Sequence, residues 1–367
     1  MPRFVFVLEQ TLGHVAHTLN IERALAEEPG IEPTVIKLEY RPGTGLRRLP
    51  GLRTWTVGAS LAARSALRQR LRQGPADAVF IHTQVAALLA GGAMRRAPTV
   101  VSLDATPVNF DAEGAAYGHR RGAAPLETLK RAVNRHALLR AAHLVTWCHW
   151  AADSLVRDYG IDRSRIRVVP PGVDTGLFQP TERRPAGPVR VLFVGGHFER
   201  KGGVELLEAM RRVPGLAVLD VVTGSEVPAI PPGVDCTVHR GLRPQSPELV
   251  RLYREADVFA LPSRGDCMPQ AVAEALACAL PVVASRVGAI PEMVRDGENG
   301  RLVPPRDARR LGEALEGLVT DASLRAAFGR RSRTLALEEH DAGRNNRSIF
   351  RLLAEVSGAG RALLRTA

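Results

Sequence analysis

Short apolar runs alternate with helix-forming segments along the chain, and this alternation occurs in two separate series. In the N-terminal half, the runs that predict β-strands are Phe4–Leu8, Thr34–Leu38, Ala78–Ile81, Thr99–Leu103 and Leu144–Thr146. In the C-terminal half, they are Val189–Val194, Leu216–Val222, Cys236–His239, Val258–Leu261 and Pro281–Ala284. Strands that alternate with helices are typical of α/β domains built on parallel sheets.

A break between the two series predicts a domain boundary. Residues 178–188 are rich in proline and charge and follow neither a helical nor a strand period. We therefore expect an N-terminal domain at residues 1–180 and a C-terminal domain at residues 181–340. Further helices are predicted at Asp307–Val319, Ser323–Leu335 and Ser348–Val356, and the last, within residues 340–367, is expected to return to the N-terminal domain.

Composition narrows the class of protein. The chain is 45% hydrophobic and 24% charged, the balance of a globular protein. Its net charge of +12 is a possible sign of nucleic-acid binding, but aromatic residues make up only 5% and do not alternate with basic ones, which disfavours that partner. The N-terminal apolar run is too short for a signal peptide, and no apolar run is long enough to span a membrane. A cytoplasmic protein is expected.

The cysteines show no metal-binding or redox spacing. None of them forms a Cys-X-X-Cys pair or clusters with histidines, so they are interpreted as reduced thiols and no metal or cofactor is expected. They are Cys148, Cys236, Cys267 and Cys278.

The segment 255–285 carries the most informative motif. Its order is strand, loop, helix and strand, and the loop Ser263–Met268 would present the free N–H groups of a helix start to a phosphate or a sugar. Asp266 lies in the loop, and Glu274 lies on a helix face that is otherwise small and apolar. A solvated glutamate is the plain alternative, but such apolar neighbours favour a buried acid that needs a partner.

This motif resembles the retaining glycosyltransferases of family GT4, which have the GT-B fold of two Rossmann-like domains with mainly parallel sheets facing an interdomain cleft. The family pattern has an acidic residue, seven intervening positions and a glutamate, followed by a Pro-Val-Val-Ala-Ser strand. Asp266 and Glu274 match that spacing, with aspartate in place of the usual first glutamate. The resemblance implies that Glu274 holds the ribose of a nucleotide sugar and that Asp266 contacts the transferred sugar. It also implies that the loop touches sugar and phosphate through Cys267, Met268, Pro269 and Gln270.

A second segment, Val191–Gly203, ends a predicted strand in Gly195 and Gly196 and continues to Arg200 and Lys201. Glycines let the backbone approach a phosphate, and adjacent cations neutralise it, although glycine turns beside surface lysines are common. In the family the corresponding Lys-Gly motif binds the donor diphosphate, which implies catalytic roles for Lys201 and Arg200.

Further segments extend the resemblance along the chain. Val168–Asp174 resembles the family's interdomain segment, and Gly288–Gly297 with Gly300–Pro304 resembles its C-terminal loop and turn. The backbone near His239–Arg243 is where the family recognises the base, so Arg243 is a candidate donor contact.

The N-terminal domain holds the acceptor in this fold. Gly13, His14 and His17 follow the first predicted strand, and His82 comes just after another, so all four are candidate acceptor contacts; ordinary helix-capping roles remain open for His14 and His17. Asp104 ends a further strand where family members often have a His-Asp pair, so it is a candidate catalytic residue, and Leu103 replaces the histidine.

A basic stretch lies between Glu39 and Asp77, which contains eight arginines and no acidic residue. Arg64, Arg68 and Arg72 share one helical stripe beside leucines. Such a stripe suits an anionic membrane surface and equally a solvated helix, and both interpretations stay open.

Together these features predict transfer of a sugar from a UDP-, GDP- or other nucleotide sugar to an acceptor hydroxyl. The resemblance implies retention of configuration, and the lack of an Asp-X-Asp motif favours catalysis without metal. A nicotinamide-dependent oxidoreductase would need Gly-X-Gly-X-X-Gly after the first strand, where only Gly13 is found. A non-catalytic nucleotide-sugar or lipid-binding relative is the remaining alternative.

Overall fold

The computed structural model describes residues 1–11, 13–39, 55–119, 122–181 and 187–359. They form two compact units, each built on a six-stranded sheet. The first unit comprises Met1–Phe110, Arg121–Pro170 and Gly343–Ala367, and the second comprises Asp111–Arg120 and Pro171–Ala342.

The first sheet has the order β2-β1-β3-β4-β5-β6, and all of its strands are parallel. The strands are β1 (Arg3–Glu9), β2 (Glu32–Leu38), β3 (Ala78–His82), β4 (Thr99–Leu103), β5 (His143–Thr146) and β6 (Ile166–Val168). The predicted strands of this half are all present, and the short strand β6 is an addition that the sequence did not reveal.

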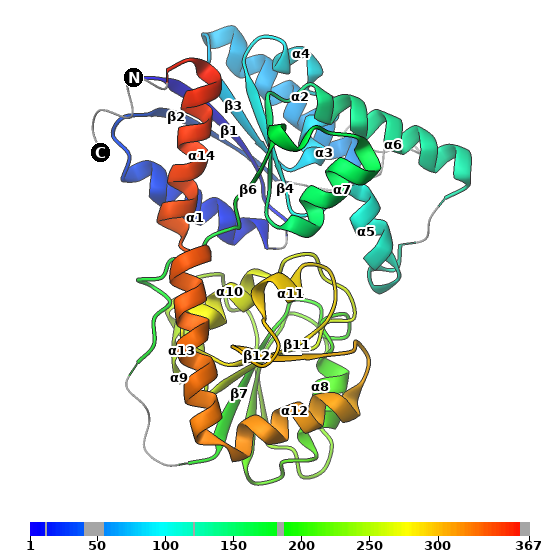
Figure 1. Ribbon diagram of the computed structural model, residues 1–367, viewed down its shortest axis with the longest axis vertical. Helices are drawn as coiled ribbons and strands as arrows, with labels where there is room; N and C mark the ends of the chain where they lie inside the picture. Colours follow the sequence, from blue (N-terminus) through cyan, green and yellow to red (C-terminus); the bar gives the residue numbers. More distant parts are fainter. Residues whose placement is uncertain (12, 40–54, 120–121, 182–186, 360–367) are drawn as a thin grey trace. The chain divides into compact units, whose positions relative to one another are not determined.

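Alternate residues of β1 enter two separate cores because successive strand side chains point to opposite faces of a sheet. Val5 and Val7 pack in one core, and Phe4, Phe6 and Leu8 in the other. The first core is covered by α2 (Trp55–Gln73), α3 (Gln84–Ala87), α4 (Gly91–Met94), α6 (Ala124–Leu139) and α7 (His149–Tyr159), the second by α1 (His14–Ala26) and α14 (Ala342–Ser357) (Figure 1).

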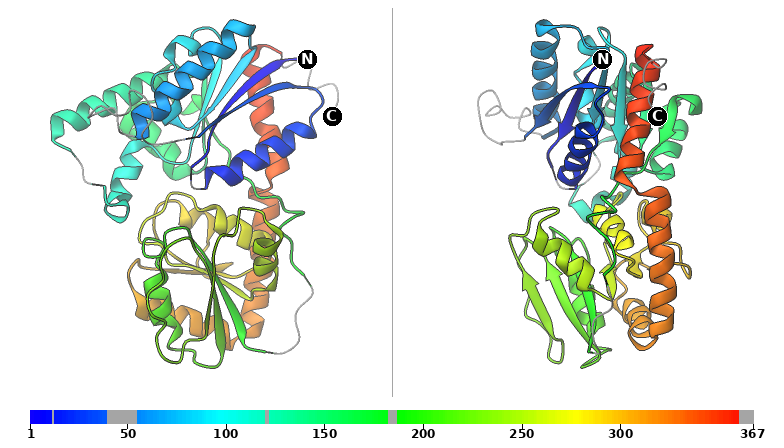
Figure 2. Two further views of the ribbon diagram at one scale, coloured as in Figure 1. Left: turned by 180° about the vertical axis from the view of Figure 1, so that it is seen from behind. Right: turned by 90° about the vertical axis from the view of Figure 1, so that its left-hand side faces the viewer.

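The C-terminal helix α14 packs on the first unit, as the sequence predicts. The ring centroids of Phe350 and Phe6 lie 5.8 Å apart, and the Asn346 side chain donates a hydrogen bond to the carbonyl of Asn20 at 3.1 Å. Figure 2 shows α14 running alongside this sheet in both turned views.

The second sheet is also parallel and has the order β12-β11-β10-β7-β8-β9. Its strands are β7 (Val189–Val194), β8 (Ala217–Val222), β9 (Cys236–His239), β10 (Val258–Leu261), β11 (Val282–Ser285) and β12 (Gly300–Val303). Helix α8 packs against α12, and α10 packs against α13. These four helices, together with α9 and α11, flank the sheet (Figure 1). These helices are α8 (Gly203–Met210), α9 (Pro247–Glu255), α10 (Gln270–Ala277), α11 (Ile290–Met293), α12 (Ala308–Thr320) and α13 (Ala322–Glu339).

Two features of the division into units differ from the expectation. The change between units falls after Pro170, because arginines of the second unit bind the backbone that follows it: Arg333 donates to the carbonyl of Phe178 at 3.0 Å, and Arg254 to that of Leu177 at 2.8 Å. Residues 111–119, which include the end of α5 (Pro107–Glu113) and the 3-10 helix η2 (Gly114–Tyr117), also belong to the second unit.

Within the described residues, no helix combines the length and apolar character that crossing a membrane requires. Of the basic stretch, residues 40–54 lie outside the described part of the chain.

Candidate active site

The predicted site residues cluster where the chain order of each sheet reverses. In the first sheet β1 lies between β2 and β3, and in the second β7 lies between β8 and β10. At such a point the loops after the two central strands separate and leave room for a ligand. His14 follows β1 and His82 ends β3, while Gly195 follows β7 and Asp266 follows β10.

Lys201 and Asp266 meet in the second unit as a closely bonded ion pair. Asp266 is buried, and it also accepts hydrogen bonds from the Ser263 hydroxyl and from the backbone N–H of Cys267, both at 3.1 Å. The loop after β10 therefore fixes the carboxylate, and the carboxylate in turn fixes the ammonium group of Lys201.

Two glycines allow this close packing. Gly202 has φ +80°, and a Cβ there would lie 1.9 Å from the carbonyl oxygen of Pro262. Gly288 has φ +50°, and a Cβ there would lie 1.9 Å from the carbonyl oxygen of Asp266. Only glycine combines a positive φ with such contacts, so both positions are needed to hold the loop against its neighbours.

The two glycines that follow β7 differ in their surroundings. A Cβ at Gly195 would lie 2.9 Å from Cγ of Lys201, so this residue leaves room for the lysine side chain. At Gly196, which is exposed, a Cβ would meet nothing within 4 Å. Packing around a Cβ therefore does not explain Gly196, whose carbonyl accepts a hydrogen bond from the Ser225 hydroxyl at 2.8 Å.

Glu274 is buried on α10, as its apolar neighbours indicate. Burial raises the pKa of its carboxyl to about 7, and a hydrogen bond from the Tyr253 hydroxyl acts in the opposite direction. Burial, followed by the charge of Glu274, raises the pKa of Tyr253 well above its usual value, so the phenol stays protonated and can donate. The Tyr253 hydroxyl on the preceding helix, α9, therefore lies beside this acid, and it also donates to the carbonyl of Ala271 at 3.3 Å.

The start of α10 carries a buried polar group that has no partner within the described residues. Cys267, Met268, Pro269 and Gln270 are all buried, and α10 begins at Gln270 with Pro269 as its N-cap. Within the described residues, the side-chain nitrogen of Gln270 is buried and has no hydrogen-bond partner. A buried unpaired amide is costly, so this group is suited to a ligand.

The two predicted arginines have different environments. Arg200 donates to the carbonyl of Gly265 at 3.1 Å, and its guanidinium lies 4.4 Å from the ring centroid of Tyr117. Arg243 is exposed in the loop between β9 and α9, and the described contacts do not connect it to the Lys201–Asp266 pair.

Glu113 lies beside the loop that holds Asp266, although it is far from that loop in the sequence. It was not recognised in the sequence. Its carboxylate accepts a hydrogen bond from the backbone N–H of Gly288 at 3.3 Å. Burial raises its pKa, the Gly288 bond lowers it, and the negative charge of Asp266 raises it further. Gly265 lies against the same segment, since a Cβ there would be 2.5 Å from Ala116.

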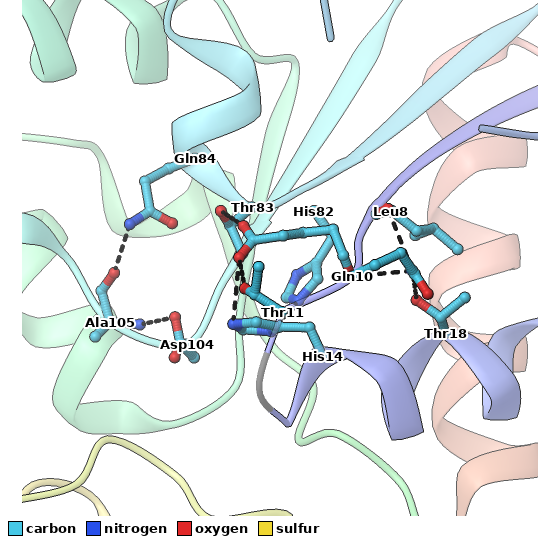
Figure 3. A network of polar contacts seen from close by, with 11 residues as sticks. Leu8, Gln10, Thr11, His14, Thr18, His82, Thr83, Gln84, Asp104 and Ala105 are labelled. Carbon is cyan, nitrogen blue, oxygen red and sulfur yellow. Dashed lines mark hydrogen bonds and ion pairs between the residues drawn. The ribbon is translucent and has the colours of Figure 1, made fainter. Parts of the chain in front are cut away.

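In the first unit the predicted histidines form one aromatic cluster around Trp147. The ring of His82 stacks on Trp147 with centroids 5.0 Å apart. Nε2 of His82 lies 2.8 Å from Nδ1 of His14, and Figure 3 shows these two histidines beside each other. His17 and His82 are buried, and burial lowers their pKa values, that of His17 to about 3. His14 retains an exposed edge, and Gly13 before it is exposed.

Glu9 is a further acid that the sequence did not single out. Its buried carboxylate accepts hydrogen bonds from Thr11 and, at 2.7 Å, from Thr83, and it lies 4.0 Å from Nε2 of His14. Burial raises its pKa.

Asp104 caps its own loop by accepting from the Ala105 N–H at 2.9 Å, and Leu103 is fully buried at the end of β4. In the described part of the chain, no three acidic, histidine or cysteine side chains are arranged to hold a metal ion.

Family models match most of the chain. Residues 13–177 match the model described as Glycosyltransferase Family 4, and residues 188–321 match the model described as Glycosyl transferases group 1. The first match covers the histidine cluster, and the second covers Lys201, Asp266 and Glu274.

Two curated relatives are named D-inositol 3-phosphate glycosyltransferase. The protein from Saccharomonospora viridis is 37% identical over 209 residues, which are 50% of this chain and 48% of the relative. That from Mycobacterium sp. strain KMS is 29% identical over 342 residues, 86% of this chain and 77% of the relative. The chain thus spans about half of the first relative's length.

Solved structures share the fold. Sucrose-phosphate synthase from Thermosynechococcus elongatus has a TM-score of 0.78 at 18% identity, covering 98% of this chain and all of the other. Anabaena HepE in complex with UDP-glucose has a TM-score of 0.66 at 17% identity, covering 97% of this chain and all of the other. With its two Rossmann-like units and both family matches, the chain belongs to glycosyltransferase family 4 and has the GT-B fold.

Proposed function

We propose that this glycosyltransferase moves a hexosyl or related sugar from a nucleoside diphosphate sugar to an acceptor hydroxyl with retention of configuration. The observation that carries the proposal is the Lys201–Asp266 pair at the reversal point of the second sheet, with buried Glu274 one helix further along the chain. A cation for the diphosphate and acids for the sugar and ribose are thereby held on a single unit.

Each group has a distinct task in this proposal. The bond between the sugar's anomeric carbon and the diphosphate oxygen breaks, the acceptor oxygen bonds to that carbon, and the acceptor's proton passes to the departing phosphate. Lys201 and Arg200 stabilise the charge that develops on the diphosphate. Asp266 orients the sugar, and Glu274 accepts hydrogen bonds from the ribose hydroxyls. The Gln270 side chain, which lacks a partner within the described residues, is available as a further donor.

The comparisons support a first choice of substrates. HepE was solved with UDP-glucose, so uridine nucleotide sugars are the first donors to test. The name shared by these two relatives suggests D-inositol 3-phosphate as the first acceptor to test. On the first unit, we propose that Gly13, His14 and Asp104 contact the acceptor, and that buried His17 and His82 position His14.

The decisive test is release of free nucleotide from a panel of UDP and GDP sugars, with EDTA present because the reaction is proposed to need no metal. We expect slow hydrolysis by the wild type and faster release with a suitable acceptor. Lys201→Ala should lower kcat/KM about 100-fold or more. Lys37→Ala is the matched control, since Lys37 forms an exposed ion pair with Glu22 elsewhere, and it should retain activity.

A non-catalytic nucleotide-sugar-binding role is the second candidate, favoured by the buried Leu103 where family members carry a histidine. Nucleotide would then raise the thermal stability without turnover on any acceptor, and this outcome would reject the transferase proposal. Loss of turnover on EDTA treatment, restored by Mg²⁺, would reject only the metal-free mechanism. The cytoplasmic location stays a prediction.

A further inference from the structure

A groove on the first unit is lined by five arginines that the proposed donor chemistry does not use. It has a volume of about 430 Å³ and lies between α2 and the segment from the end of α3 through α4. Its charged lining residues are Arg64, Arg68, Arg95, Arg96 and Arg140. The rest of the described lining is leucine, alanine and glycine, without a carboxylate.

The sequence brings these cations together in two ways. Arg64 and Arg68 are four residues apart on α2, so they lie on one helix face, while Leu67 is buried beneath. Arg140 follows the last residue of α6 and places its guanidinium against Gly91, where a Cβ would lie 2.2 Å from Nη1. A residue larger than glycine would displace the guanidinium from the groove.

The groove arginines carry charge that no described residue neutralises. Among the described residues, no ion pair or side-chain hydrogen bond engages any of the five. Grouped unpaired guanidinium groups repel one another and gain most from a shared anion, and their planar donors match phosphate oxygens. We therefore expect a phosphate-bearing ligand.

Exposed apolar side chains in the groove, on α2 and along α6 point to the source of the phosphate. Leu89 lines the groove and is exposed, and exposed Leu61 precedes Arg64 by one turn on α2. Helix α6, which ends beside Arg140, carries a stripe of exposed side chains: Leu126 at 49%, Leu129 at 60% and Val133 at 45%. Figure 1 shows α6 projecting from the first unit. Binding of a soluble phosphate would leave these leucines exposed to water, whereas a membrane interface would bury them.

We propose that this face, the arginine groove together with the exposed stripe of α6, binds anionic phospholipid headgroups at a bilayer surface. The arginines hold lipid phosphates, and the leucines enter the boundary between headgroups and acyl chains. The proposal revises the stripe expected from the sequence: Arg64 and Arg68 line the groove, but Arg72 does not. It is independent of the proposed sugar transfer.

The test measures partition of the full chain onto vesicles of phosphatidylglycerol and phosphatidylcholine by sedimentation. Arg68→Ser/Arg140→Ser should weaken binding about thirtyfold, because each basic side chain near an anionic surface contributes roughly a factor of five. Arg72→Ser/Arg163→Ser removes the same charge from exposed arginines outside the groove and should retain most of the binding. Equal loss in both double variants would overturn the groove assignment.

A second comparison separates a membrane from a soluble anion. Leu129→Ser should weaken vesicle binding, while Leu337→Ser, an exposed leucine of the second unit, should not. If Leu129→Ser has no effect and millimolar inorganic phosphate abolishes vesicle binding, the groove takes a free phosphate and the proposal is wrong. Equal binding to pure phosphatidylcholine would also overturn it. Arg64→Ser/Arg68→Ser provides a second groove variant if the first does not fold.

Discussion

Replacement of Glu274 by glutamine tests how the burial of this carboxyl changes the stability of the protein with pH. The carboxyl pKa rises from its usual 4.5 to about 7, chiefly through burial. Because the pKa is higher in the folded protein, the protonated acid's contribution to stability is complete below pH 4.5 and is lost as the pH rises through about 7. At 1.36 kcal/mol per unit, the wild type loses about 3 kcal/mol across this window.

Glutamine has nearly the shape of the protonated acid, can still accept from the Tyr253 hydroxyl, and does not titrate. We therefore expect Glu274→Gln to match the wild type near pH 4.5 and to exceed its stability by about 3 kcal/mol at pH 8. For a unit of this size, that difference corresponds to a midpoint higher by roughly 6–12 °C. Differential scanning calorimetry over this pH range measures it, on the transition that added UDP shifts upward.

Nucleotide affinity should change with pH in the opposite direction to stability, because the ionised form of Glu274 destabilises the fold but favours binding. If ribose hydroxyls donate to Glu274, the ionised form binds and the protonated form does not. The ionised fraction rises about tenfold between pH 6 and pH 8, so wild-type affinity for UDP should rise by a similar factor. Calorimetric titration should find weak and pH-independent binding for Glu274→Gln.

Glu316→Gln is the matched control, because Glu316 forms an exposed ion pair with Arg212. Its stability difference from the wild type should change little over the same pH range. A constant difference between Glu274→Gln and the wild type from pH 4.5 to pH 8 would refute the reasoning, since it would mean that Glu274 does not titrate in this window.

Substitutions of Gly288 and Glu113 test the loop that holds Asp266. Gly288→Ala should destabilise the second unit by more than about 2 kcal/mol, because φ is +50° and the added Cβ meets the Asp266 carbonyl oxygen. The control Gly196→Ala, where a Cβ meets nothing, should leave stability within about 0.5 kcal/mol, and thermal unfolding compares the two; equal losses would contradict the loop geometry. Glu113→Gln should retain the hydrogen bond from the Gly288 N–H, whereas Glu113→Ala should lose about 1 kcal/mol. Equal unfolding midpoints for these two variants would exclude a stabilising role for that bond.

The features that the sequence predicts correctly are those set by local spacing. The alternation of Val5 and Val7 with Phe4 and Phe6 is consistent with a strand buried on both faces, and both cores use it. Asp266 and Glu274 lie close in the sequence, within one loop and helix, so the strand-loop-helix order was enough to predict where they lie. The position of Lys201 could likewise be predicted, because it comes shortly after a strand that ends in two glycines.

The features that the sequence could not predict join residues far apart in the chain. Tyr253 lies on α9, and no helical period relates it to Glu274 on α10. Glu113 reaches Gly288 from a segment whose neighbours in the sequence belong to the first unit. The contact of Arg140 with Gly91 likewise depends on how α6 ends against α4. Each contact requires the packed fold, because neither partner alone has a distinctive sequence pattern.

The two reversal points share a topology and differ in charge, and the difference bears on the reaction. In the second unit Lys201 forms an ion pair with Asp266, and Arg200 lies on the same loop. In the first unit His17 and His82 are held neutral by burial, and the groove arginines lie on α2, on the α4 segment and after α6 rather than on the loops that directly follow β1 and β3. In the proposed reaction, negative charge develops on the leaving diphosphate, whereas the attacking hydroxyl arrives neutral. Cations at one point and neutral imidazoles at the other therefore fit a transferase whose donor and acceptor sites lie on separate units.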